Sequence, residues 1–181
     1  MILTGRQNLL RAVRKTQNGF YFGDDKGNEV LLPNKFVTPE IEIGTVLNLF
    51  IYNDHLNRLV ATTQQPLIEY RKCACLKVVE VSEIGAFLDW GLDKHLFIPN
   101  SEQMEKLIPG QNIVVLMYID IVSDRLVASQ RIDRFILTRQ LNLNKVKKYT
   151  SSAGEKLRLI ITLLLKINIL DYYFTVIHIK N

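Results

Sequence analysis

The sequence predicts an all-β fold of two tandem five-stranded barrels, followed by a short C-terminal extension for which no structure is predicted. Four residues of very different type recur at a fixed spacing of 66 positions. They are Gly19, Tyr21, Pro33 and Gly44 in the first copy, and Gly85, Phe87, Pro99 and Gly110 in the second. Within each copy, short runs rich in β-branched and aromatic residues alternate with Gly, Asn, Asp and Pro clusters, which is typical of a small barrel or sandwich.

Each copy contains five such runs. The expected strands are residues 9–15, 20–23, 29–32, 45–52 and 59–63 in the first copy, and 75–81, 86–90, 96–98, 112–119 and 126–129 in the second. In the second copy, residues 101–105 follow the third run and are typical of a helical turn capped by Ser101. Five short strands with a connector after the third are the plan of an OB-fold barrel, whose second and third strands commonly face oligonucleotides. We therefore expect modules at residues 1–66 and 67–138, with 139–181 as a linker and a partial or truncated third module.

The charge does not by itself indicate a nucleic-acid partner for the two modules. The chain has a net charge of +5, but residues 1–134 hold 15 basic and 16 acidic side chains, whereas residues 135–181 hold 8 and 2. The beginning of the chain lacks a secretory cleavage site, and the apolar run at 157–170 is interrupted by Arg158 and Lys166. We therefore expect a cytoplasmic protein with no membrane partner.

The sequence offers no catalytic or metal-binding constellation. Cys73 and Cys75 are one residue apart, and the three histidines are scattered, so no zinc ligand set is evident. The chain has no nucleotide-binding glycine loop, no H-E-x-x-H and no G-x-S-x-G motif, and its close acid pairs belong to hairpin turns. We predict a protein that is not an enzyme and that needs no metal or cofactor.

Residues 85–91 (GAFLDWG) and 96–102 (LFIPNSE) resemble the RNA-binding module first described in ribosomal protein S1, with its G-A-F-V-D-x-G and G-L-V-H-x-S-E pattern. The resemblance implies RNA-facing residues at Phe87, Asp120 and Arg125 in the second module. In the first module the matching positions are Tyr21 and Arg58, with Asp54 in the corresponding turn. The second module departs from the pattern at three positions, where Ile84 replaces an aromatic residue, Pro99 a histidine and Leu96 a glycine.

A more specific resemblance rests on the M-x-L-x-G at 1–5, the V-L-L-P at 30–33, the A-T-T at 61–63 and the G-A-F-L-D-W-G-L-D-K at 85–94. This combination is similar to the conserved virulence factor B family over residues 1–138. The resemblance implies a bacterial regulator of gene expression that binds RNA through tandem S1-type modules ahead of a C-terminal winged-helix domain. From residue 156 onward the chain lacks Gly, Pro, Ala, Glu and Gln, so we hypothesise a truncated or frame-shifted end.

Two interpretations remain open for each candidate site residue. Tyr21 and Phe87 are either platforms for stacked bases or core aromatics, and Arg58 and Arg125 either contact phosphates or pair with Asp54 and Asp120. Trp90 either extends the stacking surface or fills an interface between the barrels. Lys94 and His95 either reach a phosphate or lie in a solvated turn. Two basic groups, Arg6, Arg11, Arg14 and Lys15 in one and Lys145, Lys147 and Lys148 in the other, are either electrostatic footprints or solvated surface.

The predicted function is binding of single-stranded RNA by tandem OB-folds, with a regulatory role in gene expression. The alternative is a protein-interaction scaffold that docks on a ribosomal or regulatory partner without contacting RNA. Single-stranded DNA is a third candidate partner.

Overall fold

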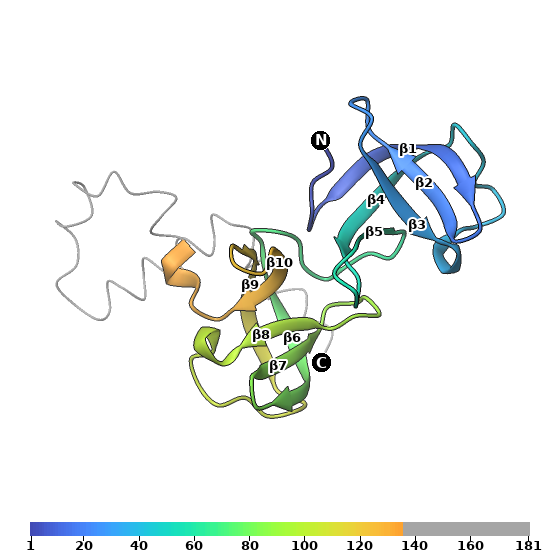
Figure 1. Cartoon of the computed structure of the whole chain (residues 1–181). Helices are drawn as coiled ribbons and strands as arrows, with labels where there is room; N and C mark the ends of the chain where they lie inside the picture. Colours follow the sequence, from blue (N-terminus) through green and yellow to red (C-terminus); the bar gives the residue numbers. More distant parts are fainter. Residues whose placement is uncertain (136–181) are drawn as a thin grey trace, which may run out of the picture. The chain divides into compact units, whose positions relative to one another are not determined.

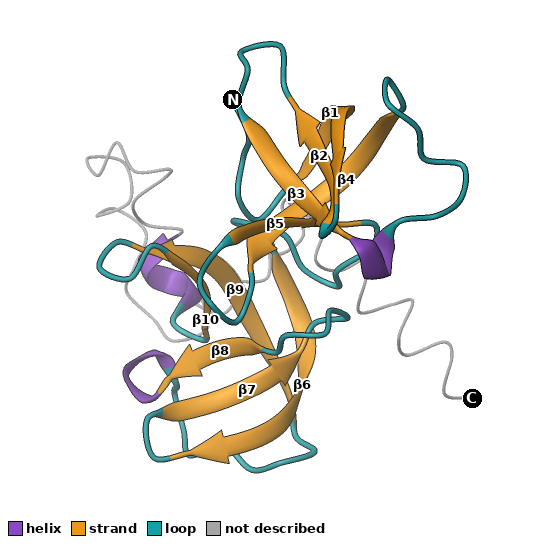
Figure 2. Ribbon diagram, turned by 45° about the vertical axis from the view of Figure 1, so that its right-hand side comes forward, coloured by secondary structure: helices purple, strands orange, loops and turns teal. Residues whose placement is uncertain are grey.

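The computed structural model describes residues 1–135, which contain two closed five-stranded barrels (Figure 1). The strands of the first barrel are β1 (Gln7–Thr16), β2 (Gly19–Gly23), β3 (Glu29–Pro33), β4 (Val46–Asn53) and β5 (Leu59–Thr62). Those of the second barrel are β6 (Cys73–Ser82), β7 (Gly85–Asp89), β8 (Leu96–Pro99), β9 (Asn112–Asp120) and β10 (Arg125–Ser129). Short 3-10 helices, η1 (Asn34–Phe36) and η2 (Asn100–Glu102), follow the third strand of each barrel (Figure 2).

The two barrels have the same strand order, which confirms the predicted OB-fold. The first closes as β1-β2-β3-β5-β4, and the second as β6-β7-β8-β10-β9. Neighbouring strands are antiparallel except that the third and fifth strands of each barrel run parallel, through Leu31 and Val60 in the first and Phe97 and Val127 in the second. The 66-residue repeat in sequence is therefore a repeat of topology.

The ten expected strands lie within two residues of the observed bounds, but the expected helical cap is wrong. Helix η2 begins after Pro99, one residue earlier than predicted, and no side chain caps it. The first barrel carries the equivalent helix η1, again after a proline, which the sequence interpretation missed. Proline fixes φ near the value that a helix start requires, so it begins the turn where no capping side chain is present.

Alternation along the strands builds a separate core in each barrel. In the first barrel Leu10 and Ala12 of β1, Phe20 and Phe22 of β2, and Leu49 of β4 point inward and are almost fully buried. Burying a side chain of this size stabilises a fold by roughly 1.5–3 kcal/mol, so each small barrel depends on a handful of these residues.

Strand β4 is buried on both of its faces. Leu49 and Ile51 belong to the core of the first barrel, whereas Phe50 and Tyr52, on the opposite face, belong to the core cluster of the second barrel. Trp90, directly after β7, meets Phe50 at 5.8 Å and Tyr52 at 6.2 Å between ring centroids, edge to face in both cases. The two barrels therefore share an apolar interface, and residues Met1–Gln130 form one compact unit.

The segment before β1 contributes to the same unit. The Gly5 amide donates to the carbonyl of Ile51, and the Gly5 carbonyl accepts from the amide of Tyr70 at 2.7 Å. At φ +74°, a Cβ at Gly5 would lie 2.8 Å from a methyl carbon of Leu126 and 2.9 Å from the Cβ of Tyr70. Only glycine fits here, which gives a structural reason for the last position of the M-x-L-x-G pattern.

The predicted linker and partial or truncated third module at 139–181, and the basic group of Lys145, Lys147 and Lys148, lie outside the described residues.

Candidate nucleic-acid interface

Tyr21 and Phe87 lie on the outer surfaces of the barrels and do not belong to the cores. Each is half-buried at the centre of the second strand of its barrel, between two buried residues that point inward. Of the two interpretations, a core aromatic is therefore excluded in both barrels, and the residues occupy the face that oligonucleotides commonly meet in OB-folds.

Arg14 covers the ring of Tyr21. Strand β1 has an irregularity in pairing between Ala12 and Arg14, after which Arg14 is opposite Tyr21. The guanidinium carbon lies 3.6 Å from the ring centroid, and Nε donates to Oε2 of Glu29 at 2.8 Å. The hydrogen bond to Glu29 raises the pKa of Arg14 above its ordinary value.

Phe87 has a different neighbour. The ring of Phe97 on β8 lies beside it, with centroids 5.3 Å apart and planes at 45°. A Cβ at Gly85 would come within 2.6 Å of the Phe97 ring, so the ring packs closely over the strand. The sequence interpretation missed Phe97, although it alternates with the buried residues Leu96 and Ile98 and so had to face outward.

Arg58 is paired, as one of its two interpretations proposed. Its Nε and Nη2 donate to Oδ2 of Asp54 at 2.9 and 2.6 Å, and Oδ1 of Asp54 accepts the backbone N–H of Leu56 and of Arg58. Partial burial acts to raise the pKa of Asp54, but these hydrogen bonds outweigh it and the pKa is lowered. The Arg58 side chain remains 66% exposed, so the ion pair still leaves it open to a ligand.

Arg125 does not pair with Asp120, and that expectation is wrong. Its Nε donates to Oδ1 of Asn57 at 3.0 Å, in the β4–β5 turn of the first barrel. Asp120 instead accepts from the amide and hydroxyl of Ser123, which lower the pKa of its carboxyl. The β4–β5 turn, which carries Arg58, is therefore hydrogen-bonded to Arg125, the first residue of β10.

Trp90 and Lys94 hold the interface between the barrels. Trp90 is 2% exposed and its indole N–H donates to the carbonyl of Lys94, so it fills the interface and offers no stacking surface. The ammonium of Lys94 donates to the carbonyls of Asn53 and Asp54 at 2.9 and 3.0 Å. Burial, together with the nearby charge of Arg125, lowers the pKa of Lys94. Lys94 is thus neither in a solvated turn nor set up for a phosphate, which corrects both interpretations.

The remaining candidates are dispersed. His95 is exposed beside the Trp90 loop. In the basic group of the first barrel, the Arg6 guanidinium lies 5.2 Å from the ring centroid of Tyr70, and Nη1 of Arg11 donates to the carbonyl of Gly44 at 3.0 Å. The Lys15 ammonium lies 5.4 Å from the ring centroid of Phe20. Among these basic residues, Arg14 alone lies over one of the predicted platform aromatics.

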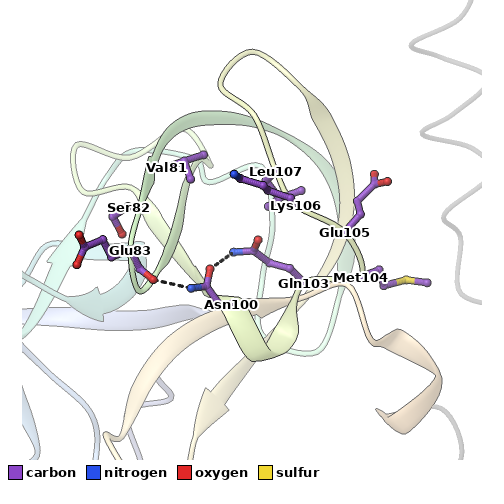
Figure 3. A pocket seen from close by; sticks show the side chains of 9 residues that line it. All are labelled: Val81, Ser82, Glu83, Asn100, Gln103, Met104, Glu105, Lys106 and Leu107. Carbon is purple, nitrogen blue, oxygen red and sulfur yellow. Dashed lines mark hydrogen bonds between the residues drawn. The ribbon is translucent and has the colours of Figure 1, made fainter.

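A separate groove of about 760 Å³ lies between the β6–β7 turn and the segment after η2 (Figure 3). Inside it, the Asn100 amide donates to the carbonyl of Glu83 at 2.6 Å, and its oxygen accepts from the side-chain amide of Gln103. In the first barrel Asn34 makes the same bond to the carbonyl of Gln17. The recurrence shows that these asparagines tie the hairpin turn to the helix, so their role here is structural.

Within residues 1–135, no three His, Cys, Asp or Glu side chains come together as a metal site. Nor does this part of the chain contain a helix long and apolar enough to cross a membrane.

Comparisons with known proteins agree with this architecture. The S1 domain family model matches residues 4–64 and again 72–131. The chain is 33% identical over 95 residues to the uncharacterized protein YitL of Bacillus subtilis (strain 168), a match that covers 52% of this chain and 32% of that protein. A crystal structure of a multidomain protein with nucleic acid binding domains from Streptococcus pneumoniae TIGR4 matches with a TM-score of 0.58 at 19% identity. That match covers 69% of this chain and 45% of the other, and at this identity it shows the fold alone.

The chain thus spans about a third of the curated relative and under half of the solved structure. The two matched stretches coincide with the two barrels and together cover more than half of the sequence. The chain belongs to the S1 domain family, with two S1 domains in tandem.

Proposed function

We propose that the protein is a non-catalytic, nucleic-acid-binding protein whose partner is single-stranded RNA. The observation that carries the proposal is the outward aromatic at the same strand position of both barrels, Tyr21 and Phe87. Bases stack at these two positions, with a contribution on the order of 1–3 kcal/mol per stacked base. The solved neighbour, described as having nucleic acid binding domains, supports the same partner class.

The arginines supply the phosphate contacts in this proposal. Arg58 is two-thirds exposed, and Arg125 begins β10 and is bonded to Asn57 in the adjacent turn. Because the two turns are joined, one RNA strand passes both arginines. Asp120 orders the β9–β10 turn and does not itself contact a phosphate.

The proposed regulatory role rests on the resemblance to the conserved virulence factor B family. On that basis we propose a cytoplasmic bacterial regulator of gene expression with modules at 1–66 and 67–138. Single-stranded DNA is a weaker partner in this proposal.

A protein-interaction scaffold is the alternative, and three observations favour it. The residue at the position of the usual RNA-facing histidine is Pro99, and the modules carry almost no net charge. Lys94 and Trp90 are also engaged in holding the barrels together.

The affinity of the full chain for a short unstructured RNA at two salt concentrations separates the two functions. RNA binding predicts micromolar or tighter affinity that weakens as salt rises, and its loss in the double variant Tyr21→Ala/Phe87→Ala. The double variant Ile43→Ala/Met104→Ala, which truncates one exposed apolar side chain in each barrel, is the matched control. If the wild-type chain fails to bind RNA at low salt, RNA binding is refuted and the scaffold remains.

A further inference from the structure

The first barrel does not present Tyr21 as a bare ring. The Arg14 guanidinium carbon lies 3.6 Å from the ring centroid, which is stacking distance, so one face of the phenol is already covered. A base can therefore meet this position by displacing Arg14 or by stacking on it.

The arginine is held in place by two contacts. It rests on the ring of Tyr21, and its Nε donates to Oε2 of Glu29 on β3 at 2.8 Å. Together these contacts hold the guanidinium over the ring, while 49% of the Arg14 side chain remains exposed. The exposed side of the guanidinium is the part left to meet a ligand, and its position is set before the ligand arrives.

The second barrel lacks this arrangement although its strands match. Strand β6 has the same irregularity, between Val78 and Glu80, and it puts Glu80 opposite Phe87 where Arg14 is opposite Tyr21. A carboxylate does not stack on a base, and the second barrel instead has Phe97 beside Phe87. The two barrels thus differ in the chemistry that they offer at the same position.

Building on the proposed function, we propose that the first barrel binds a base of a single-stranded nucleic acid on the guanidinium of Arg14. Tyr21 and Glu29 are then positioning residues, whereas in the second barrel the base stacks directly on the ring of Phe87. A guanidinium is planar and more weakly hydrated than an ammonium, so it supports a base on its face as an aromatic ring does.

The test compares variants of the full chain by fluorescence anisotropy with two labelled oligonucleotides of equal length, one unstructured RNA and one with abasic residues. Arg11→Ala removes an equal charge from the same strand and measures the loss due to charge alone. We expect Arg14→Ala to weaken RNA binding on the order of tenfold. This loss of affinity for RNA should be larger than the loss caused by Arg11→Ala. For the abasic oligonucleotide, the two variants should lose the same affinity.

Two further variants test whether the Tyr21 ring suffices to position Arg14 and whether the planar guanidinium is needed. Tyr21→Phe keeps the ring under Arg14 and is expected to bind RNA within twofold of wild type, whereas Arg14→Lys keeps the charge but loses the plane and is expected to bind as weakly as Arg14→Ala. Thermal unfolding of each variant checks that the barrel is intact.

The outcomes separate this inference from the proposed function. If Arg14→Ala binds RNA as well as or better than wild type while Phe87→Ala loses affinity, the Tyr21 ring is itself the platform and this inference is wrong. It is equally wrong if Arg14→Ala weakens both oligonucleotides alike. If the wild-type chain binds no RNA, the proposed function fails and this inference fails with it.

Discussion

Replacing Trp90 with alanine should weaken the interface between the two barrels so that they unfold in separate transitions. Trp90 is 2% exposed and contacts Phe50 and Tyr52 of the first barrel edge to face. Truncating a buried tryptophan of this kind costs about 3–5 kcal/mol of unfolding free energy. Two aromatic edge contacts, each worth about 0.5–1.5 kcal/mol, account for a large share of that cost. The hydrogen bond from the indole to the carbonyl of Lys94 accounts for about 1 kcal/mol of the same total.

The variant Trp90→Phe separates the contribution of the ring contacts from that of the indole hydrogen bond. It keeps a ring against Phe50 and Tyr52 but leaves the carbonyl of Lys94 without its indole partner, so we expect a loss of about 1–2 kcal/mol. Urea unfolding followed by far-UV circular dichroism measures both variants, because Trp90 is the sole tryptophan and its fluorescence disappears with it. In the wild type we expect one cooperative transition for residues 1–130, and in Trp90→Ala two.

Phe87→Ala is the matched control, since Phe87 is a half-buried aromatic on the outer face of β7, three residues before Trp90. We expect it to cost less than half as much as Trp90→Ala. If Trp90→Ala costs less than about 1 kcal/mol and keeps a single transition, Trp90 does not hold the barrels together and our account of the interface fails.

Three other expectations follow from the same contacts. Burial, with the charges of Asp93 and Asp54, raises the pKa of Tyr52 to about 12. Because the unfolded chain releases this proton near pH 10, stability should fall as pH rises from about 10 to about 12, and Tyr52→Phe should remove that fall in urea titrations. Lys94→Met should lower the unfolding free energy by about 1–3 kcal/mol, since it removes the hydrogen bonds that the ammonium donates to the carbonyls of Asn53 and Asp54; an unchanged urea midpoint would contradict this. Gly85→Ala should cost about 3 kcal/mol, because its Cβ would collide with the carbonyl of Ile98 and with the Phe97 ring; a cost no greater than that of a surface substitution would count against it.

The fold was predictable from the sequence because it follows from local patterns. Glycine and proline at equivalent positions mark the same turns in both copies, and apolar alternation marks the same strands. Leu96 and Ile98 alternate with Phe97, so even the outward direction of that ring was encoded. The short helix after each third strand was harder to place, because it begins with a proline and lacks a capping side chain.

The interface between the barrels was only partly predictable. The run Leu49-Phe50-Ile51-Tyr52 is apolar on both faces of a strand, which indicates that both faces are buried. The run does not identify what covers the outer face. The role of Lys94 depends on that packing, because its partners are backbone carbonyls some forty residues away in the sequence.

The stacking of Arg14 on Tyr21 could not be predicted from alternation. Leu10 and Ala12 point into the core, so strict alternation would turn Arg14 inward as well. The irregularity between Ala12 and Arg14 reverses the direction, and Arg14 comes to lie on the outer face. An extra residue in a strand changes which side chains share a face, and nothing in the local composition marks it.

Chemical-shift mapping of the isotopically labelled full chain during titration with a short single-stranded RNA tests the central claim most directly. We predict that the largest amide shifts occur in β2 and β3, in β7 and β8, and in the turns that carry Arg58 and Arg125. Shifts confined to the groove between the β6–β7 turn and the segment after η2, or no shifts at low salt, would contradict the account.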